Sequence, residues 1–109
     1  MAVFAVTTVW GPNRDPARSR RDQDAWDEHA AFMDSLVEDG FIIIGGPIDE
    51  ERTMLAIEAR DVDEIRSRMA EDPWAPIGLL QIEEIRPWTI WLDGRTSQRG
   101  RSPAEATPS

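Results

Sequence analysis

The stretch WDEHAAFMDSLVEDGFIIIGGP, residues 26–47, decides the fold of this chain. Its apolar side chains recur at steps of three and four, the period of one helix face, and predict a helix over residues 21–39. Gly40 follows the last periodic residue, where a helix commonly ends. The apolar run at residues 41–44 predicts a strand covered on both faces, and residues 45–47, GGP, predict a sharp turn. Together these elements predict the wall and the floor of a pocket.

Three further strands are expected on either side of that stretch. Residues 2–10, AVFAVTTVW, are rich in β-branched and aromatic types and predict a central strand. Residues 53–59, TMLAIEA, resume an apolar pattern and predict another strand. Residues 79–92 alternate between apolar and polar side chains until Pro87, and a proline at that place fits an edge strand.

A second helix is expected to begin at Asp61, with Glu64 three residues later at the spacing of a capping box. Pro73 ends this helix and forces Asp72 out of helical geometry. The resulting order is strand, helix, strand, strand, helix, strand. It predicts an α+β, ferredoxin-like fold in which two helices cover one face of a four-stranded antiparallel sheet.

Such a fold leaves the second face of the sheet bare. We expect Trp10, Trp88, Trp91 and several isoleucines to line that face. A bare apolar sheet face is an interaction surface by default, so the sequence predicts a homodimer that buries it.

The composition limits the classes of protein to consider. A length of 109 residues fits one domain, expected at residues 1–92, followed by a flexible tail at residues 93–109 with no apolar side chain of leucine size or larger. The net charge of −9 argues against nucleic-acid binding, which needs a basic face. No window approaches the roughly 18 consecutive apolar residues of a membrane helix, so we expect a cytoplasmic protein without a membrane partner.

The residue types present also limit the chemistry. The chain has no cysteine, no lysine and one histidine, which removes disulfides, thiolate metal sites and thiol nucleophiles. No second histidine or suitably spaced acid completes a metal motif, and no glycine-rich nucleotide loop is present. We therefore expect no metal and no cofactor.

Residues 11–21, GPNRDPARSRR, carry two prolines and four arginines and predict an exposed loop. The loop exceeds the common connection length of about 4–6 residues, and loops this long often act as lids or binding segments. Two interpretations stay open. The arginines face an anionic ligand, or the segment is a solvated connector whose arginines balance nearby acids.

His29 is the residue able to change charge near neutral pH without special help. Asp72 precedes Pro73 and Trp74, so its carboxylate is expected beside a large flat apolar surface. A carboxylate next to an imidazole can hold its tautomer and stabilise the imidazolium, as in many general acid–base sites. The alternatives are a histidine packed in the core and an aspartate that caps a turn.

These residues resemble a known family. The first stretch quoted above, DPW at residues 72–74 and IRPWTIWL at residues 85–92 are together similar to the YciI-like (YCII-related) proteins of the dimeric α+β barrel superfamily, over about residues 3–92. The resemblance implies a ferredoxin-like fold, sheets paired face to face in a dimer, and a pocket in each subunit between sheet and helices. It also implies a catalytic pair of His29 and Asp72, with Gly46 and Pro47 lining the pocket.

Most of this family has no assigned function. One branch is similar to enzymes that remove HCl from chlorinated hydroxyquinols, and neighbouring superfamilies include muconolactone isomerases and cofactor-free monooxygenases. The present chain departs from the compact first connector of the family, because its loop at residues 11–21 is long and rich in arginine.

The first functional hypothesis is a cofactor-independent, dehydrochlorinase-like lyase or isomerase that acts on a small cyclic or aromatic metabolite. His29 would move a proton and Asp72 would orient it. The expected substrate-binding residues are Trp26, Met33, Gly45, Gly46, Pro47 and Trp74. The alternative is a non-catalytic module for small-ligand binding or dimerisation, in which Asp72 lies beyond the hydrogen-bond range of about 2.6–3.2 Å from His29. A purely structural protein with a filled pocket is the third interpretation.

Overall fold

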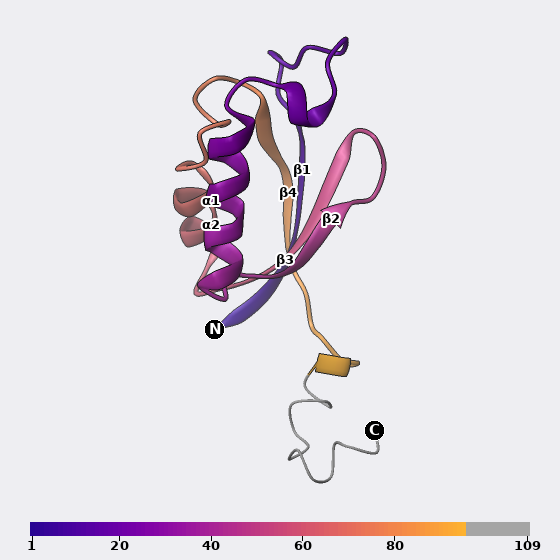
Figure 1. Ribbon diagram of the computed structural model, residues 1–109. Coiled ribbons are helices and arrows are strands. Elements are labelled where there is room, and N and C mark those ends of the chain that lie inside the picture. Colours follow the sequence, from indigo (N-terminus) through magenta and orange to yellow (C-terminus); the bar gives the residue numbers. More distant parts are fainter. Residues whose placement is uncertain (96–109) are drawn as a thin grey trace, which may run out of the picture.

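The structure, a computed structural model, describes residues 1–95 as one sheet covered by two helices (Figure 1). The elements are β1 (Ala2–Trp10), a short 3-10 helix η1 (Arg20–Asp22), α1 (Trp26–Glu38), β2 (Ile42–Pro47), β3 (Arg52–Ala59), α2 (Val62–Met69) and β4 (Leu80–Pro87). The strand order is β2-β3-β1-β4, and every neighbouring pair is antiparallel. The predicted ferredoxin-like α+β fold is confirmed. The flexible tail expected from residue 93 falls mainly on residues 96–109, outside the described part.

Alternation along the central strands places one set of side chains beneath the helices. Phe4 and Val6 on β1 are buried and lie opposite Ile57 and Leu55 on β3. Residues on one face of a sheet recur with a period of two, so this set forms a continuous apolar surface. The helices bury their own apolar side chains on that surface, namely Leu36, Ile65 and Met69.

The end of α1 and the beginning of α2 lie where the sequence predicts them. Gly40 has a φ of +81°, the left-handed geometry that glycine adopts without steric cost, and its N–H donates to the carbonyl of Val37 at 3.0 Å. The Asp61 carboxylate accepts a 2.8 Å hydrogen bond from the N–H of Glu64, so the predicted cap of α2 is confirmed. The Glu64 carboxylate reaches back to the N–H of Arg60, one residue before the cap.

The first helix is shorter at its beginning than the sequence predicts. Residues 20–22 form the separate helix η1, and Ala25 has a left-handed φ of 58°, which a continuous α-helix does not contain. The expected start at residue 21 was therefore wrong. Acidic residues before Trp26 resemble the first turn of a helix, but they belong to the loop.

The sharp turn expected at residues 45–47 was also wrong. Gly45 and Gly46 continue β2 and pair with β3, and the hairpin turns two residues later. A Cβ on Gly45 would overlap the side chain of Leu55, so glycine serves close packing at this position. The turn is held by the Asp49 carboxylate, which accepts hydrogen bonds from the N–H groups of Glu51 and Arg52 at 2.8 and 2.7 Å. These bonds lower the pKa of Asp49.

The open face of the sheet carries apolar side chains, but not every expected member is among them. Ile44 is 67% exposed, and Trp88 lines the same hollow on this face. Trp91 is exposed beyond the end of β4 and does not line that hollow. Trp10 instead shares the helix side of β1 with Phe4 and Val6, and its ring lies 5.7 Å from that of Trp74. The placement of Trp10 on the open face was therefore wrong.

Two glycines join the long first loop to the segment that follows α2. The N–H of Gly11 donates to the carbonyl of Leu79 at 2.8 Å, and the N–H of Asn13 donates to the carbonyl of Gly78 at 2.9 Å. A Cβ on Gly11 would overlap the backbone of Gly78. The two segments therefore approach as closely as backbones allow, and this contact fixes where the loop lies.

We expect Gly11→Ala to lower the free energy of unfolding by about 1–3 kcal/mol or more, because the new methyl group meets rigid backbone. Gly46→Ala is the control, since nothing lies within 4 Å of its Cβ, and we expect a change below about 1 kcal/mol. Urea unfolding followed by tryptophan fluorescence measures both. Equal stability of the two variants would contradict the close approach.

Candidate functional site

The predicted pair of ionisable side chains is in direct contact. His29 lies in the first turns of α1, and Asp72 follows the end of α2. The Nδ1 atom of His29 lies 2.9 Å from Oδ1 and 2.8 Å from Oδ2 of Asp72. The residues are 6% and 1% exposed, so the pair is buried. Two segments that are 43 positions apart are thus joined by one polar contact.

The Asp72 carboxylate is oriented by the chain that follows it. The N–H of Trp74 donates to Oδ1 of Asp72 at 2.8 Å, and the N–H of Ala75 donates to the Asp72 carbonyl at 2.9 Å. Pro73 lies between Asp72 and Trp74 in the sequence, and a proline cannot continue a helix. The local backbone therefore holds the Asp72 carboxylate in position independently of its contact with His29.

This contact assigns the two nitrogens of His29 to different roles. An ionised carboxylate only accepts hydrogen bonds, so Nδ1 carries a proton and Nε2 presents its lone pair in the neutral ring. Nε2 has no hydrogen-bond partner within residues 1–95, and it is not among the fully buried unpaired atoms of that range. Within the described residues, Nε2 is therefore the nitrogen of His29 that is left without a protein partner and able to exchange a proton.

Two tryptophans hold the imidazole in place. The Trp74 ring stacks on the His29 ring at a centroid distance of 3.8 Å and an interplanar angle of 3°, and the Trp26 ring is tilted at 5.8 Å. The indole N–H of Trp74 donates to the carbonyl of Asp24 at 2.7 Å. Trp74 is 0% exposed, so its side chain supports the imidazole and presents no surface to a ligand, whereas Trp26 is half-buried.

The other expected ligand-binding residues lie further along α1. Met33, Gly45 and Gly46 line a groove of about 180 Å³ between α1 and the hairpin of β2 and β3. Met33 is one helical turn beyond His29 on α1, and His29 itself does not line the groove. Pro47 is exposed at the end of β2 and does not line the groove.

A larger hollow of about 280 Å³ lies between α2 and β4. Its polar lining comes from Thr8, Arg66 and Gln81, and it contains no histidine or carboxylate. It therefore offers no group suited to proton transfer near neutral pH, and the surroundings of His29 are the better candidate.

A comparison with protein families matches residues 7–89 to the YCII-related domain. The chain belongs to this family. A comparison with curated proteins finds no significant match. The matched range includes the imidazole, the carboxylate, both tryptophans that contact His29, and the groove.

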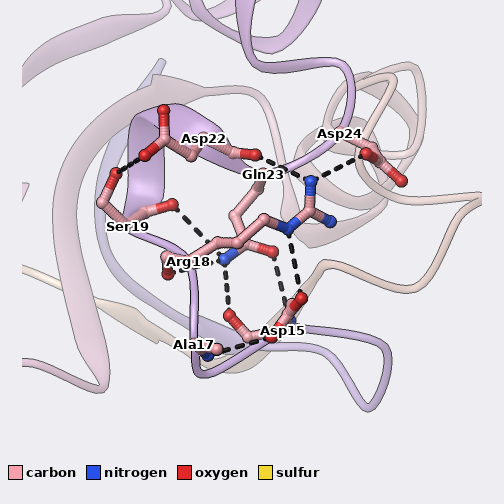
Figure 2. Close-up of polar contacts among 7 residues, drawn as sticks. All are labelled: Asp15, Ala17, Arg18, Ser19, Asp22, Gln23 and Asp24. Atoms are coloured by element: carbon pink, nitrogen blue, oxygen red, sulfur yellow. Dashed lines mark hydrogen bonds and ion pairs between the residues drawn. The ribbon is translucent and has the colours of Figure 1, made fainter.

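In this YCII-related domain the long first loop is an ordered structure built around Gln23, as Figure 2 shows. Gln23 is buried, and its Nε2 donates to the carbonyls of Asp15 and Arg18 at 2.8 and 3.0 Å. Its Oε1 accepts from the N–H of Asp15 at 3.1 Å. No pattern in the sequence indicated this role, because a single glutamine within a polar loop is unremarkable in composition.

The exposed side chain of Arg18 forms ion pairs with two acidic residues of the same loop. Its guanidinium contacts the carboxylates of Asp24 and Asp15 at 3.1 and 3.2 Å (Figure 2). The hydrogen bond to Asp24 raises the pKa of Arg18 above its ordinary value. The charge of this arginine is therefore balanced within the loop.

Two other arginines of the loop lie against Trp10. The guanidinium carbons of Arg14 and Arg20 are each 4.6 Å from the centroid of the Trp10 ring. Burial, together with the charge of Arg14, lowers the pKa of Arg20. Within residues 1–95, the Nε atom of Arg14 is the one buried side-chain nitrogen or oxygen without a hydrogen-bond partner.

Residues 1–95 contain no group of three histidine, cysteine or acidic side chains arranged to hold a metal ion. Neither α1 nor α2, the α-helices of the described elements, is long and apolar enough to span a bilayer.

We expect Asp72→Ala to lower the free energy of unfolding by about 2–4 kcal/mol, because it leaves the Nδ1–H of His29 and the N–H of Trp74 buried without an acceptor. Asp72→Asn retains one acceptor oxygen and should lose less. The exposed Asp34 on α1 is the control, and Asp34→Ala should change stability by no more than about 0.5 kcal/mol. Urea unfolding measures all three, and equal effects for Asp72→Ala and Asp34→Ala would contradict the role of the carboxylate as a shared acceptor.

Proposed function

We propose that this YCII-related protein is a cofactor-independent lyase or isomerase that acts on a small cyclic or aromatic metabolite. His29 exchanges a proton with the substrate through Nε2, and Asp72 fixes the tautomer through Nδ1. The observation that carries this proposal is the buried contact of Nδ1 with both oxygens of Asp72, at 2.8 and 2.9 Å. It is the arrangement of a base held by an orienting carboxylate.

The proposed step begins with an acidic C–H bond of the substrate. Nε2 takes the proton, and the electrons of the C–H bond pass into the conjugated system of the substrate. The Asp72 carboxylate stabilises the imidazolium that forms, since an opposite charge in contact favours the charged ring. An isomerase returns the proton at another carbon, whereas a lyase completes the step by expelling an anionic leaving group.

The rate enhancement that a general acid–base can supply limits the kind of substrate. A positioned general acid–base supplies about 10²–10⁴-fold in rate, which suits a C–H bond that the substrate itself activates. The groove that begins one helical turn along α1 from His29, at Met33, has a volume of about 180 Å³, less than the roughly 300–1,000 Å³ of pockets for drug-sized ligands. Both points favour a molecule of one ring.

The same contact supports this proposal over a non-catalytic binding module. That alternative expected His29 and Asp72 to be separated, whereas they are within hydrogen-bond distance. A buried pair of this kind is a weak source of stability, because desolvating the charges offsets their attraction.

We expect His29→Gln to reduce enzyme-catalysed hydrogen exchange at an activated C–H by about 10²–10⁴-fold. Proton NMR in deuterium oxide, with a panel of cyclic enones and unsaturated lactones, measures the loss of the C–H signal. Asp72→Asn should reduce the rate by at least about tenfold and change the tautomer that the nitrogen-15 shifts of the ring report. Asp27→Asn, on the exposed side of α1, is the control and should keep the rate of the unmodified protein. Full exchange in His29→Gln would remove the proposal.

We also propose that the protein forms a homodimer through the open face of its sheet. An apolar hollow of about 240 Å³ on that face is lined by side chains that include Val3, Ile44, Ala56 and Trp88. An exposed apolar patch of this kind favours association of two copies about a twofold axis, because each copy supplies the same surface.

We expect Ile44→Asp to shift the protein to a monomer in sedimentation equilibrium, because it places a carboxylate within the proposed interface. Val37→Asp is the matched control. Val37 is 53% exposed on α1, compared with 67% for Ile44 on the sheet, so the two variants add the same charge at similarly exposed positions. A monomeric unmodified protein, or dissociation by Val37→Asp alone, would contradict an interface on the sheet.

A further inference from the structure

The first loop brings two cations to the aromatic cluster that supports His29. Trp10 carries the guanidinium groups of Arg14 and Arg20, each 4.6 Å from its centroid. The Trp10 ring lies 5.7 Å from that of Trp74, which stacks on the imidazole of His29. Two indole rings, those of Trp10 and Trp74, therefore connect the pair of arginines to the proposed base.

The charges of these two arginines are poorly balanced by the protein itself. Arg20 forms no ion pair within residues 1–95, although the whole chain has a net charge of −9. Arg14 meets Glu51 at 3.6 Å, and the Glu51 side chain is 64% exposed, so water screens this contact. The buried Nε of Arg14 has no partner in the described part of the chain. Within an acidic chain, Arg20 therefore has no ion pair in the described residues and Arg14 has only a screened one, which leaves both able to pair with an external anion.

Arg14 and Arg20 differ from Arg18, whose charge is used in ion pairs within the loop. Arg18 is bound by Asp15 and Asp24, and the buried amide of Gln23 ties the backbone of the loop together (Figure 2). The contact of Gly11 with Leu79 anchors the beginning of the loop. The loop is therefore organised before any ligand binds, and Arg14 and Arg20 are presented at fixed places beside Trp10.

We propose that Trp10, Arg14 and Arg20 form a subsite that binds a carboxylate of a planar small molecule. Guanidinium groups pair with carboxylates through planar, charge-assisted hydrogen bonds, and the neighbouring indole supplies an apolar surface for the ring that bears the carboxylate. This inference rests on the proposed function in one respect: it makes the anion part of the molecule on which His29 acts. An anion there would offset the repulsion between the guanidinium groups of Arg14 and Arg20.

The test uses sodium benzoate as the probe and nitrogen-15 NMR of the unmodified protein as the readout. We expect a saturable shift of the Trp10 indole N–H signal and of the Arg14 Nε–H signal. Benzamide, which has the same shape without the charge, should bind at least about tenfold more weakly, because the recognition is charge-assisted. Inorganic phosphate is titrated in parallel, since it shares the oxyanion chemistry but lacks the ring.

Variants then assign the binding to the two arginines. Arg14→Gln and Arg20→Gln should each weaken benzoate binding by at least about tenfold, while Arg20→Lys should retain part of it because the charge remains without the planar fork. Arg68→Gln is the matched control, because Arg68 also lies over an aromatic ring, that of Phe41 at 4.5 Å, and loses the same charge. Urea unfolding of each variant confirms that the fold is retained.

The outcomes separate this inference from the proposed function. His29→Gln should bind benzoate like the unmodified protein even though its C–H exchange is lost. Binding that depends on Arg14 and Arg20 without any exchange activity would support the subsite and contradict the proposed enzyme. No benzoate shift, or equal loss of binding in Arg68→Gln, would overturn the subsite. Tight phosphate binding without benzoate binding would overturn its assignment to a carboxylate.

Discussion

The buried carboxylate of Asp72 is the constraint on which the rest of the structure depends. A buried charge is costly unless it is paired and hydrogen-bonded, and this one receives the Nδ1–H of His29 and the N–H of Trp74. Those two bonds join α1 to the chain that follows α2. The indole of Trp74 then reaches the carbonyl of Asp24, just before α1, so the same few side chains connect both helices to the loop between β1 and α1.

The parts of the fold that are determined by residues close together in the sequence could be predicted. The stop of α1 at Gly40, the cap of α2 at Asp61 and the edge position of a strand that ends at Pro87 each follow from local chemistry. The hairpin turn could not be placed, because glycines serve a turn and a close backbone approach equally well. At Gly45 the neighbouring Leu55 decides between the two, and that contact comes from another strand.

The site was predicted unevenly for a similar reason. His29 and Asp72 could be singled out by residue type and by family resemblance, but their contact spans 43 positions and has no local pattern. Trp10 was placed on the wrong face because β1 is apolar on both sides for part of its length, so alternation did not reveal its orientation. Gln23 could not be recognised at all, since its role depends on the backbone carbonyls that the folded loop turns towards it.

The two proposed roles are linked through the balance of charge. An imidazolium at His29 would form at the other end of the Trp10–Trp74 pair from two guanidinium groups, and like charges disfavour each other across a poorly solvated site. Asp72 offsets this repulsion on the Nδ1 side, and a bound carboxylate would offset it at the arginines. Under these proposals, a substrate that bears the anion prepares the site for its own proton transfer, whereas a neutral molecule of the same shape leaves the three cations in opposition. Substrate selection and proton transfer would then depend on the same electrostatic field, although different side chains carry them.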